Sequence, residues 1–257
     1  MADTELQIVS ALARATAYRT FSLAFQTPTD ARLRTMGAHE AFAVLLDAFR
    51  CLDADASRDL APSVNRLREA GQSLEVLTLD YWRVFGHTTR GLVCACETEY
   101  GDDNKFQQPN QLADISGYYL AFGLMPPSAS EVRQDHVACE CEFMEFLNLK
   151  EAWFLEAGGE TGEAEDTLAV TRQAQRTFLR EHLGYFGRGF ALRLATDGGG
   201  RYFSAWGALF LRFLEGECAR LGVEGGPAEL PIRAELSDDA PMACGSASDL
   251  IQIQRHP

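Results

Sequence analysis

The stretch RYFSAWGALFLRFLEGECARLG, residues 201–222, places its large apolar side chains three or four positions apart, as on one face of an α-helix. These side chains are Tyr202, Phe203, Trp206, Leu209, Phe210, Phe213, Leu214, Cys218 and Leu221. Similar spacing recurs along most of the chain, and no stretch has alternating strands joined by hairpin turns. The sequence therefore predicts an all-α fold.

Capping residues, glycines and prolines delimit the other helices. We expect them over residues 4–27, 30–49, 62–85, 109–122, 128–157 and 161–186, the last with a break near Gly184. A loop at about 86–107 and a hinge at about 123–130, containing Pro126 and Pro127, interrupt the pattern. We predict one helical-bundle domain over residues 1–222, followed by an extended or disordered tail over 223–257.

The charge of the chain limits its partners. With 23 Lys and Arg against 37 Asp and Glu, its formal net charge is −14. Such a field repels nucleic acid and anionic membranes and attracts basic ligands, although excess acid also serves solubility alone. No apolar run approaches the roughly 18 residues of a membrane span, and the first residues do not resemble a secretory signal. We expect a cytoplasmic protein without membrane insertion.

Two cysteine pairs, Cys94 with Cys96 and Cys139 with Cys141, suggest a metal or thiol-redox site. On a helix, however, side chains two positions apart point about 200° apart and cannot reach one ion. We therefore predict no metal and no cofactor, and keep a thiol-redox or metal-binding protein as the alternative function.

Acidic residues gather on both sides of the predicted hinge. Asp135, His136 and Glu140 lie near the start of a helix, and Glu97, Glu99 and Tyr100 lie in the loop. Carboxylates bind arginine through paired hydrogen bonds, so these six residues are a candidate site for a basic peptide. The alternative is a solvated acidic face, and His182 fits a buried core histidine. No nucleotide-binding or catalytic motif is present, so an enzyme on a familiar template is unsupported and we assign no catalytic residues.

Several motifs resemble those of the TorD/DmsD/NarJ-type chaperones, which mature molybdenum oxidoreductases. The main one is Asp135-His136-x-x-x-Glu140-Cys141-Glu142-Phe143-Met144, although the family usually has Leu in place of Cys141. Phe178-Leu179-x-x-His182-Leu183 and the final helix are also similar. The stretches 85–88, 97–101, 106–109 and 112–119 resemble more closely the chaperone subunits of dimethyl sulfide, ethylbenzene and selenate oxidoreductases.

The resemblance implies a TorD-like all-helical fold without catalytic activity. The implied partner is the precursor of a molybdenum oxidoreductase catalytic subunit, bound through its core, its twin-arginine signal peptide or both while the molybdopterin cofactor is inserted. It also implies exchange of helices between two copies across the hinge, that is, a domain-swapped homodimer. A third hypothesis is a chaperone that responds to guanine nucleotide near Asp135 and His136, for which the sequence offers no phosphate-binding loop.

Overall fold

The computed structural model describes residues 2–37, 39–52, 62, 64–65, 67, 73–87, 91–101, 107–125, 132–157, 162–199 and 201–233. Within these ranges every regular element is a helix, and the extended pairings are two isolated bridges. The all-α prediction is confirmed. None of the described helices is both long and apolar enough to cross a lipid bilayer.

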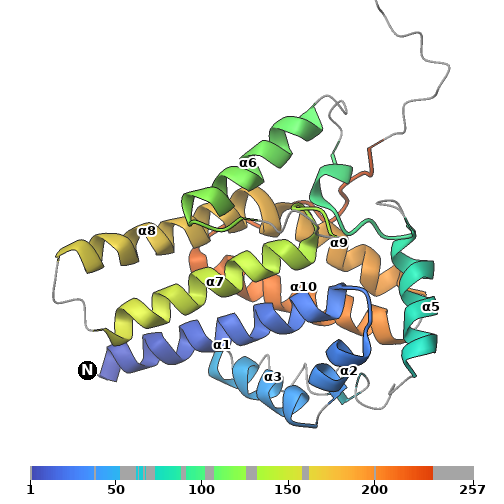
Figure 1. The fold of residues 1–257 in the computed structure, drawn as a ribbon, viewed down its shortest axis with the longest axis horizontal. Helices are drawn as coiled ribbons and strands as arrows, with labels where there is room; N and C mark the ends of the chain where they lie inside the picture. The colour runs from blue at the N-terminus through green and yellow to red at the C-terminus, as the bar shows by residue number, and fades with distance from the viewer. Residues whose placement is uncertain are drawn as a thin grey trace, which may run out of the picture.

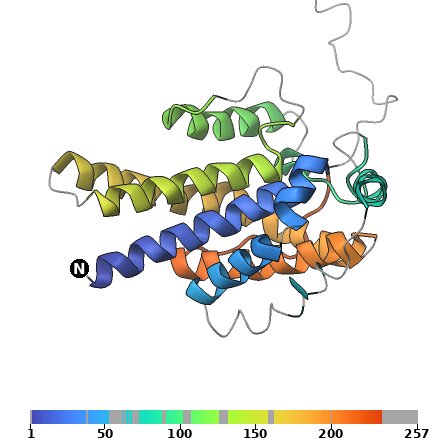
Figure 2. The same cartoon turned by 60° about the horizontal axis from the view of Figure 1, so that its bottom comes forward.

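The helices form a bundle around α1 and α7, which run side by side (Figure 1). The elements are α1 (Ala2–Phe25), α2 (Asp30–Gly37), α3 (His39–Leu52), α5 (Leu74–Phe85), the 3-10 turn η1 (Glu97–Glu99), α6 (Gln108–Ala121), α7 (Val137–Glu156), α8 (Gly162–Phe178), the π-helical turn η3 (Leu179–Leu183), α9 (Gly184–Asp197) and α10 (Arg201–Leu221). Helix α8 packs on α7, α10 packs on α9, and α3 packs on α1. Figure 2 shows α6 on the outer side of α7.

The predicted apolar face of residues 201–222 lies in the centre of the bundle. Phe210 of α10 is fully buried, and its ring lies 4.9 Å from that of Phe21 and 5.1 Å from that of Phe25, both on α1. Trp206 is also fully buried and meets Phe21 edge to face. Aromatic pairs at these distances add to the stabilisation from apolar burial, so α1 and α10 are joined mainly through this core.

A second aromatic cluster holds α6 against the bundle. The ring of Tyr119 on α6 lies 5.0 Å from that of Phe143 on α7, and Phe143 lies 4.8 Å from Phe178 at the end of α8. The Tyr119 hydroxyl donates a hydrogen bond to the carbonyl of Gln134, just before α7. Helix α6 is thereby fixed next to the first turn of α7.

The predicted break near Gly184 is a change of helix type. The N–H of Gly184 donates to the carbonyl of Leu179, five residues earlier, which is the hydrogen bond of a π-helix. A Cβ atom at position 184 would lie only 2.3 Å from that carbonyl oxygen, so the turn requires glycine there. His182 lies within this turn and is buried.

Three predicted helices have different limits in the structure. Residues 30–49 divide into α2 and α3, since Gly37 ends the first of them. Helix α5 begins at Leu74 instead of continuing from residue 62, because Ser73 is extended and its side chain caps the N–H of Val76. Helix α7 begins at Val137 instead of residue 128, because His136 is extended and caps the helix.

After α10 the chain turns back across the bundle in extended form. Leu230 is buried, and a Cβ atom on Gly189 of α9 would lie 3.1 Å from its side chain. Ile232 then pairs with Tyr100 in an isolated bridge. Residues 234–257 of the predicted tail and residues 126–131 of the predicted hinge lie outside the described residues, so helix exchange across the hinge stays a prediction.

Candidate functional site

Two segments far apart in the sequence meet beside η1. The N–H of Glu97 donates to the carbonyl of Asp135 at 2.8 Å, and the N–H of Val137 donates to the carbonyl of Ala95 at 2.8 Å, on either side of a bridge between Cys96 and His136. This pairing joins the predicted loop to the start of α7. It brings together Glu97, Glu99, Asp135 and Glu140, whose carboxyl groups we call the acid cluster, with Tyr100 and His136 nearby.

None of the six predicted binding residues faces solvent freely. Asp135 and Glu140 are fully buried, and His136, the most exposed of the six, retains only 8% of its accessible surface. A solvated acidic face is therefore wrong for this cluster. The side chains are covered where the backbone of residues 95–97 pairs with that of residues 135–137, at the first turn of α7.

The outer side of the cluster already holds a guanidinium group of the chain itself. Nε of Arg133 donates to Oδ1 of Asp135 at 3.0 Å, Nη2 to Oδ2 at 2.8 Å, and Nη1 to Oε1 of Glu99 at 2.9 Å. Nη2 also donates to Thr98 Oγ1 at 2.6 Å. Although burial acts to lower it, the pKa of Arg133 is raised, chiefly by Asp135. Asp135 thus binds Arg133 through two parallel hydrogen bonds, the geometry that the sequence analysis predicts for an arginine of a partner peptide.

On the inner side of the cluster, the carboxyl groups of Glu97 and Glu140 form a pair, and His182 lies beside Glu97. Burial, followed by the neighbouring charge of Glu97, raises the pKa of Glu140 well above its usual value. Nδ1 of His182 lies 3.2 Å from Oε1 of Glu97. The π-helical turn η3 thus directs His182 toward the cluster, in addition to its ring contact with Phe178.

The other two predicted residues have structural contacts. Nδ1 of His136 accepts a hydrogen bond from the N–H of Ala138 at 3.1 Å and caps α7. Burial lowers the pKa of His136 to about 4, so its ring is neutral at pH 7. The Tyr100 hydroxyl donates to the carbonyl of Cys94 at 2.7 Å, and burial raises its pKa.

The region around the acid cluster matches a known family. A family model described as the nitrate reductase delta subunit matches residues 46–191, which is more than half of the chain and includes the whole acid cluster. The chain belongs to this family. No curated protein sequence matches it.

Membership of the nitrate reductase delta subunit family confirms the predicted resemblance to the NarJ/TorD-type chaperones. The family consists of chaperones for the maturation of redox enzymes, and they bind molybdoenzyme catalytic subunits. The closer likeness to the chaperones of dimethyl sulfide, ethylbenzene and selenate oxidoreductases stays a prediction.

Sequence reasoning missed Arg133 and Thr98 and assigned His182 to the core alone. Arg133 stands two residues before Asp135, a spacing that indicates a local ion pair. Nothing local connects Thr98 with Asp135, 37 positions away, or His182 with Glu97, 85 positions away. These contacts depend on the approach of the loop to α7 and on the π-helical turn.

The cysteines of the two predicted pairs are present as thiols, with Cys94, Cys96 and Cys141 buried and Cys139 half-buried. Burial raises the pKa of Cys96 and of Cys141 well above the usual value, and it raises that of Cys139 to about 12. These thiols are therefore protonated at neutral pH and lack the thiolate that redox chemistry needs. Within the described part of the chain, no three His, Cys, Asp or Glu side chains lie arranged to hold a metal ion.

Replacing Asp135 with asparagine is expected to lower the free energy of unfolding by about 2 kcal/mol. The amide keeps the size of the side chain, but it removes the charge that binds Arg133 and one of the two acceptor oxygens. Urea denaturation at pH 7 measures the loss. The control is Asp47→Asn, which alters an exposed pair with Arg50 and should change stability by less than about 0.5 kcal/mol. Equal losses in the two variants would contradict a structural role for Asp135.

Proposed function

We propose that this protein is a cytoplasmic chaperone that binds the precursor of a molybdenum oxidoreductase catalytic subunit and assists insertion of its cofactor before export or assembly. The observation that carries the proposal is the family match, which extends over the complete acid cluster. The net charge of −14 also favours a basic segment of the client, such as a twin-arginine signal peptide.

The contacts of Arg133 support a way in which the acid cluster recognises that peptide. The Arg133 side chain is 33% exposed, whereas its acceptors Glu99 and Asp135 are 6% and 0% exposed. A guanidinium group from the client has the same planar geometry, so it can replace Arg133 on these carboxylates without leaving a buried charge unpaired. In this proposal Arg133 holds the site in the absence of client and moves into solvent when the peptide binds.

Calorimetric titration with a twin-arginine signal peptide from a molybdenum oxidoreductase tests the proposal. A second peptide has lysine at both arginine positions, which keeps the charge but loses the planar fork. We expect affinity of about micromolar for the arginine peptide and weaker binding of the lysine peptide. Arg133→Gln should bind the arginine peptide more tightly than the wild-type protein does, because it removes the internal competitor.

The matched control is Arg180→Gln, which removes an exposed arginine that pairs with Glu181 outside the cluster. Arg133→Lys is a milder variant if Arg133→Gln unfolds. Equal affinity for the two peptides would contradict guanidinium recognition, and equal affinity of the Arg133 and Arg180 variants would contradict exchange at the acid cluster. If neither peptide binds but the catalytic subunit copurifies with the protein, the client is held through its core and not its signal peptide.

A further inference from the structure

A second polar site lies on α1, α8 and α10. A cavity of about 390 Å³ opens between these helices and is lined by the guanidinium side chains of Arg14, Arg172, Arg176 and Arg220. We call it the arginine pocket. It lies beside Glu151 near the end of α7, whereas the acid cluster lies at the start of that helix. From Glu140 to Glu151 the helix rises roughly 16 Å, so the two sites are separate.

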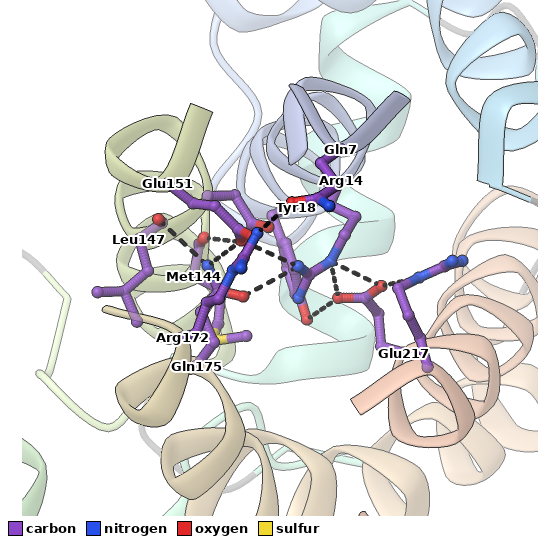
Figure 3. A network of polar contacts seen from close by, with 11 residues as sticks. Gln7, Arg14, Tyr18, Met144, Leu147, Glu151, Arg172, Gln175 and Glu217 are labelled. Carbon is purple, nitrogen blue, oxygen red and sulfur yellow. Dashed lines mark hydrogen bonds and ion pairs between the residues drawn. The ribbon is translucent and has the colours of Figure 1, made fainter. Parts of the chain in front are cut away.

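The inner wall of the arginine pocket is built from buried groups that are joined by hydrogen bonds and ion pairs (Figure 3). Nε of Arg14 donates to Oε2 of Glu217 at 2.8 Å, and its Nη1 donates to Gln175 at 2.9 Å and lies 3.5 Å from Oε2 of Glu151. Burial acts to lower the pKa of Arg14, but Glu217, Tyr18 and Glu151 together raise it above its usual value. Arg14 is thus permanently charged, and it is held in one position at the pocket.

The outer wall carries more positive charge than its carboxylates balance, although Arg172 also donates to Gln7 at 2.8 Å and Arg220 to the carbonyl of Leu52 at 3.4 Å. Nε of Arg172 donates to Glu151 at 2.7 Å, and Nε of Arg220 lies 3.3 Å from Glu217. Both carboxylates are therefore shared with Arg14. Among the described residues, the guanidinium group of Arg176 has a long contact of 3.5 Å to the carbonyl of Gly222. Arg14, Arg172 and Arg220 share the carboxylates of Glu151 and Glu217. Among the described residues the pocket therefore holds four guanidinium groups against two carboxylates, an excess of two positive charges in an acidic protein.

We propose that the arginine pocket binds a small molecule bearing a phosphate group. A phosphate carries about two negative charges at pH 7, which matches the excess, and guanidinium groups bind its oxygens in pairs. The volume lies within the range of small-ligand sites and leaves room for the rest of the molecule. The inner groups are already fixed by Glu217 and Gln175, so binding requires only that Arg172, Arg176 and Arg220 turn toward the ligand. This inference does not depend on the identity of the client.

Titration calorimetry with inorganic pyrophosphate tests the pocket, at an ionic strength kept constant with chloride. We expect saturable binding at one site per chain. Arg176→Gln and Arg172→Gln should each weaken it by about tenfold, because each removes a charge and a paired donor. The control is Arg19→Gln on α1, which removes an equal charge from a side chain that is 64% exposed and does not line the pocket. This variant should bind like the wild-type protein.

The other outcomes overturn the proposal in different ways. No saturable heat with pyrophosphate would exclude a phosphate site. Equal weakening by the Arg19, Arg172 and Arg176 variants would show that binding follows net charge and not the pocket. A parallel titration with citrate, a tricarboxylate whose charge at pH 7 is close to that of pyrophosphate, should give much weaker binding, and equal affinity would replace the phosphate assignment by a carboxylate one.

Discussion

Replacing Glu217 with glutamine is expected to lower the free energy of unfolding by about 3 to 5 kcal/mol. Glu217 is 1% exposed and accepts hydrogen bonds from Nε of Arg14 at 3.0 and 2.8 Å and from the Tyr18 hydroxyl at 3.0 Å (Figure 3). A glutamine keeps the size but leaves the buried Arg14 charge with Glu151, 3.5 Å away, as its remaining ionic partner. The cost arises mainly from this uncompensated charge in a medium of low polarity.

Urea denaturation of three variants separates the charge effect from packing. Glu215→Gln on the exposed side of α10 is the control and should change stability by less than about 0.5 kcal/mol. The double variant Arg14→Met with Glu217→Met removes both charges and should recover most of the loss, because apolar side chains of similar length can replace a buried ion pair. A double variant that is less stable than Glu217→Gln would show that the network itself, and not the unpaired charge, is what stabilises the bundle.

The wild-type protein is expected to lose stability in acid because His136 titrates, and the variant His136→Asn is expected not to show this part of the loss. The pKa of His136 is lowered to about 4 in the folded protein, against about 6.5 in the unfolded chain. As the pH falls from 6.5 to 4, this histidine is therefore protonated in the unfolded chain before it is protonated in the folded protein. The free energy of unfolding falls by about 3 kcal/mol over that range. Asparagine does not titrate, and its side-chain oxygen can replace Nδ1 as the cap of α7.

The measurement is the free energy of unfolding of both proteins between pH 4 and pH 7. The buried Glu140 titrates in both, and because its pKa is raised it acts in the opposite direction, so its contribution cancels in the difference. His87→Asn, which alters an exposed histidine, is the control. Parallel stability curves for the wild-type protein and His136→Asn would show that His136 does not titrate as its burial implies.

The sequence was sufficient to predict the helical class because a helix is a local pattern. The apolar face of residues 201–222 is set by neighbours three and four positions apart, and Trp206 and Phe210 are in the core as expected. The helix limits at Ser73 and His136 were harder to predict. Each residue caps a helix at a point where the helical spacing of apolar residues continues on both sides. The break near Gly184 could be located, but not its π-helical geometry.

The residues of the acid cluster were also found from the sequence, because carboxylates in a loop and at a helix start are visible locally. The burial of these residues was not predicted from the sequence. It depends on the pairing of segment 95–97 with residues 135–137, and on the occupation of Asp135 and Glu99 by Arg133.

The sequence by itself determined the all-α class, the acidic charge, the core face of the last helix and the family motifs, because each of these is carried by residue types or by short spacings. Only the tertiary structure decided which polar side chains meet. Arg14 and Glu217 are 203 positions apart, and Arg172 and Gln7 are 165 positions apart, yet they form one network. Periodicity places a side chain on a face of its own helix, but the partner on the neighbouring helix depends on how the helices pack, which no local pattern encodes.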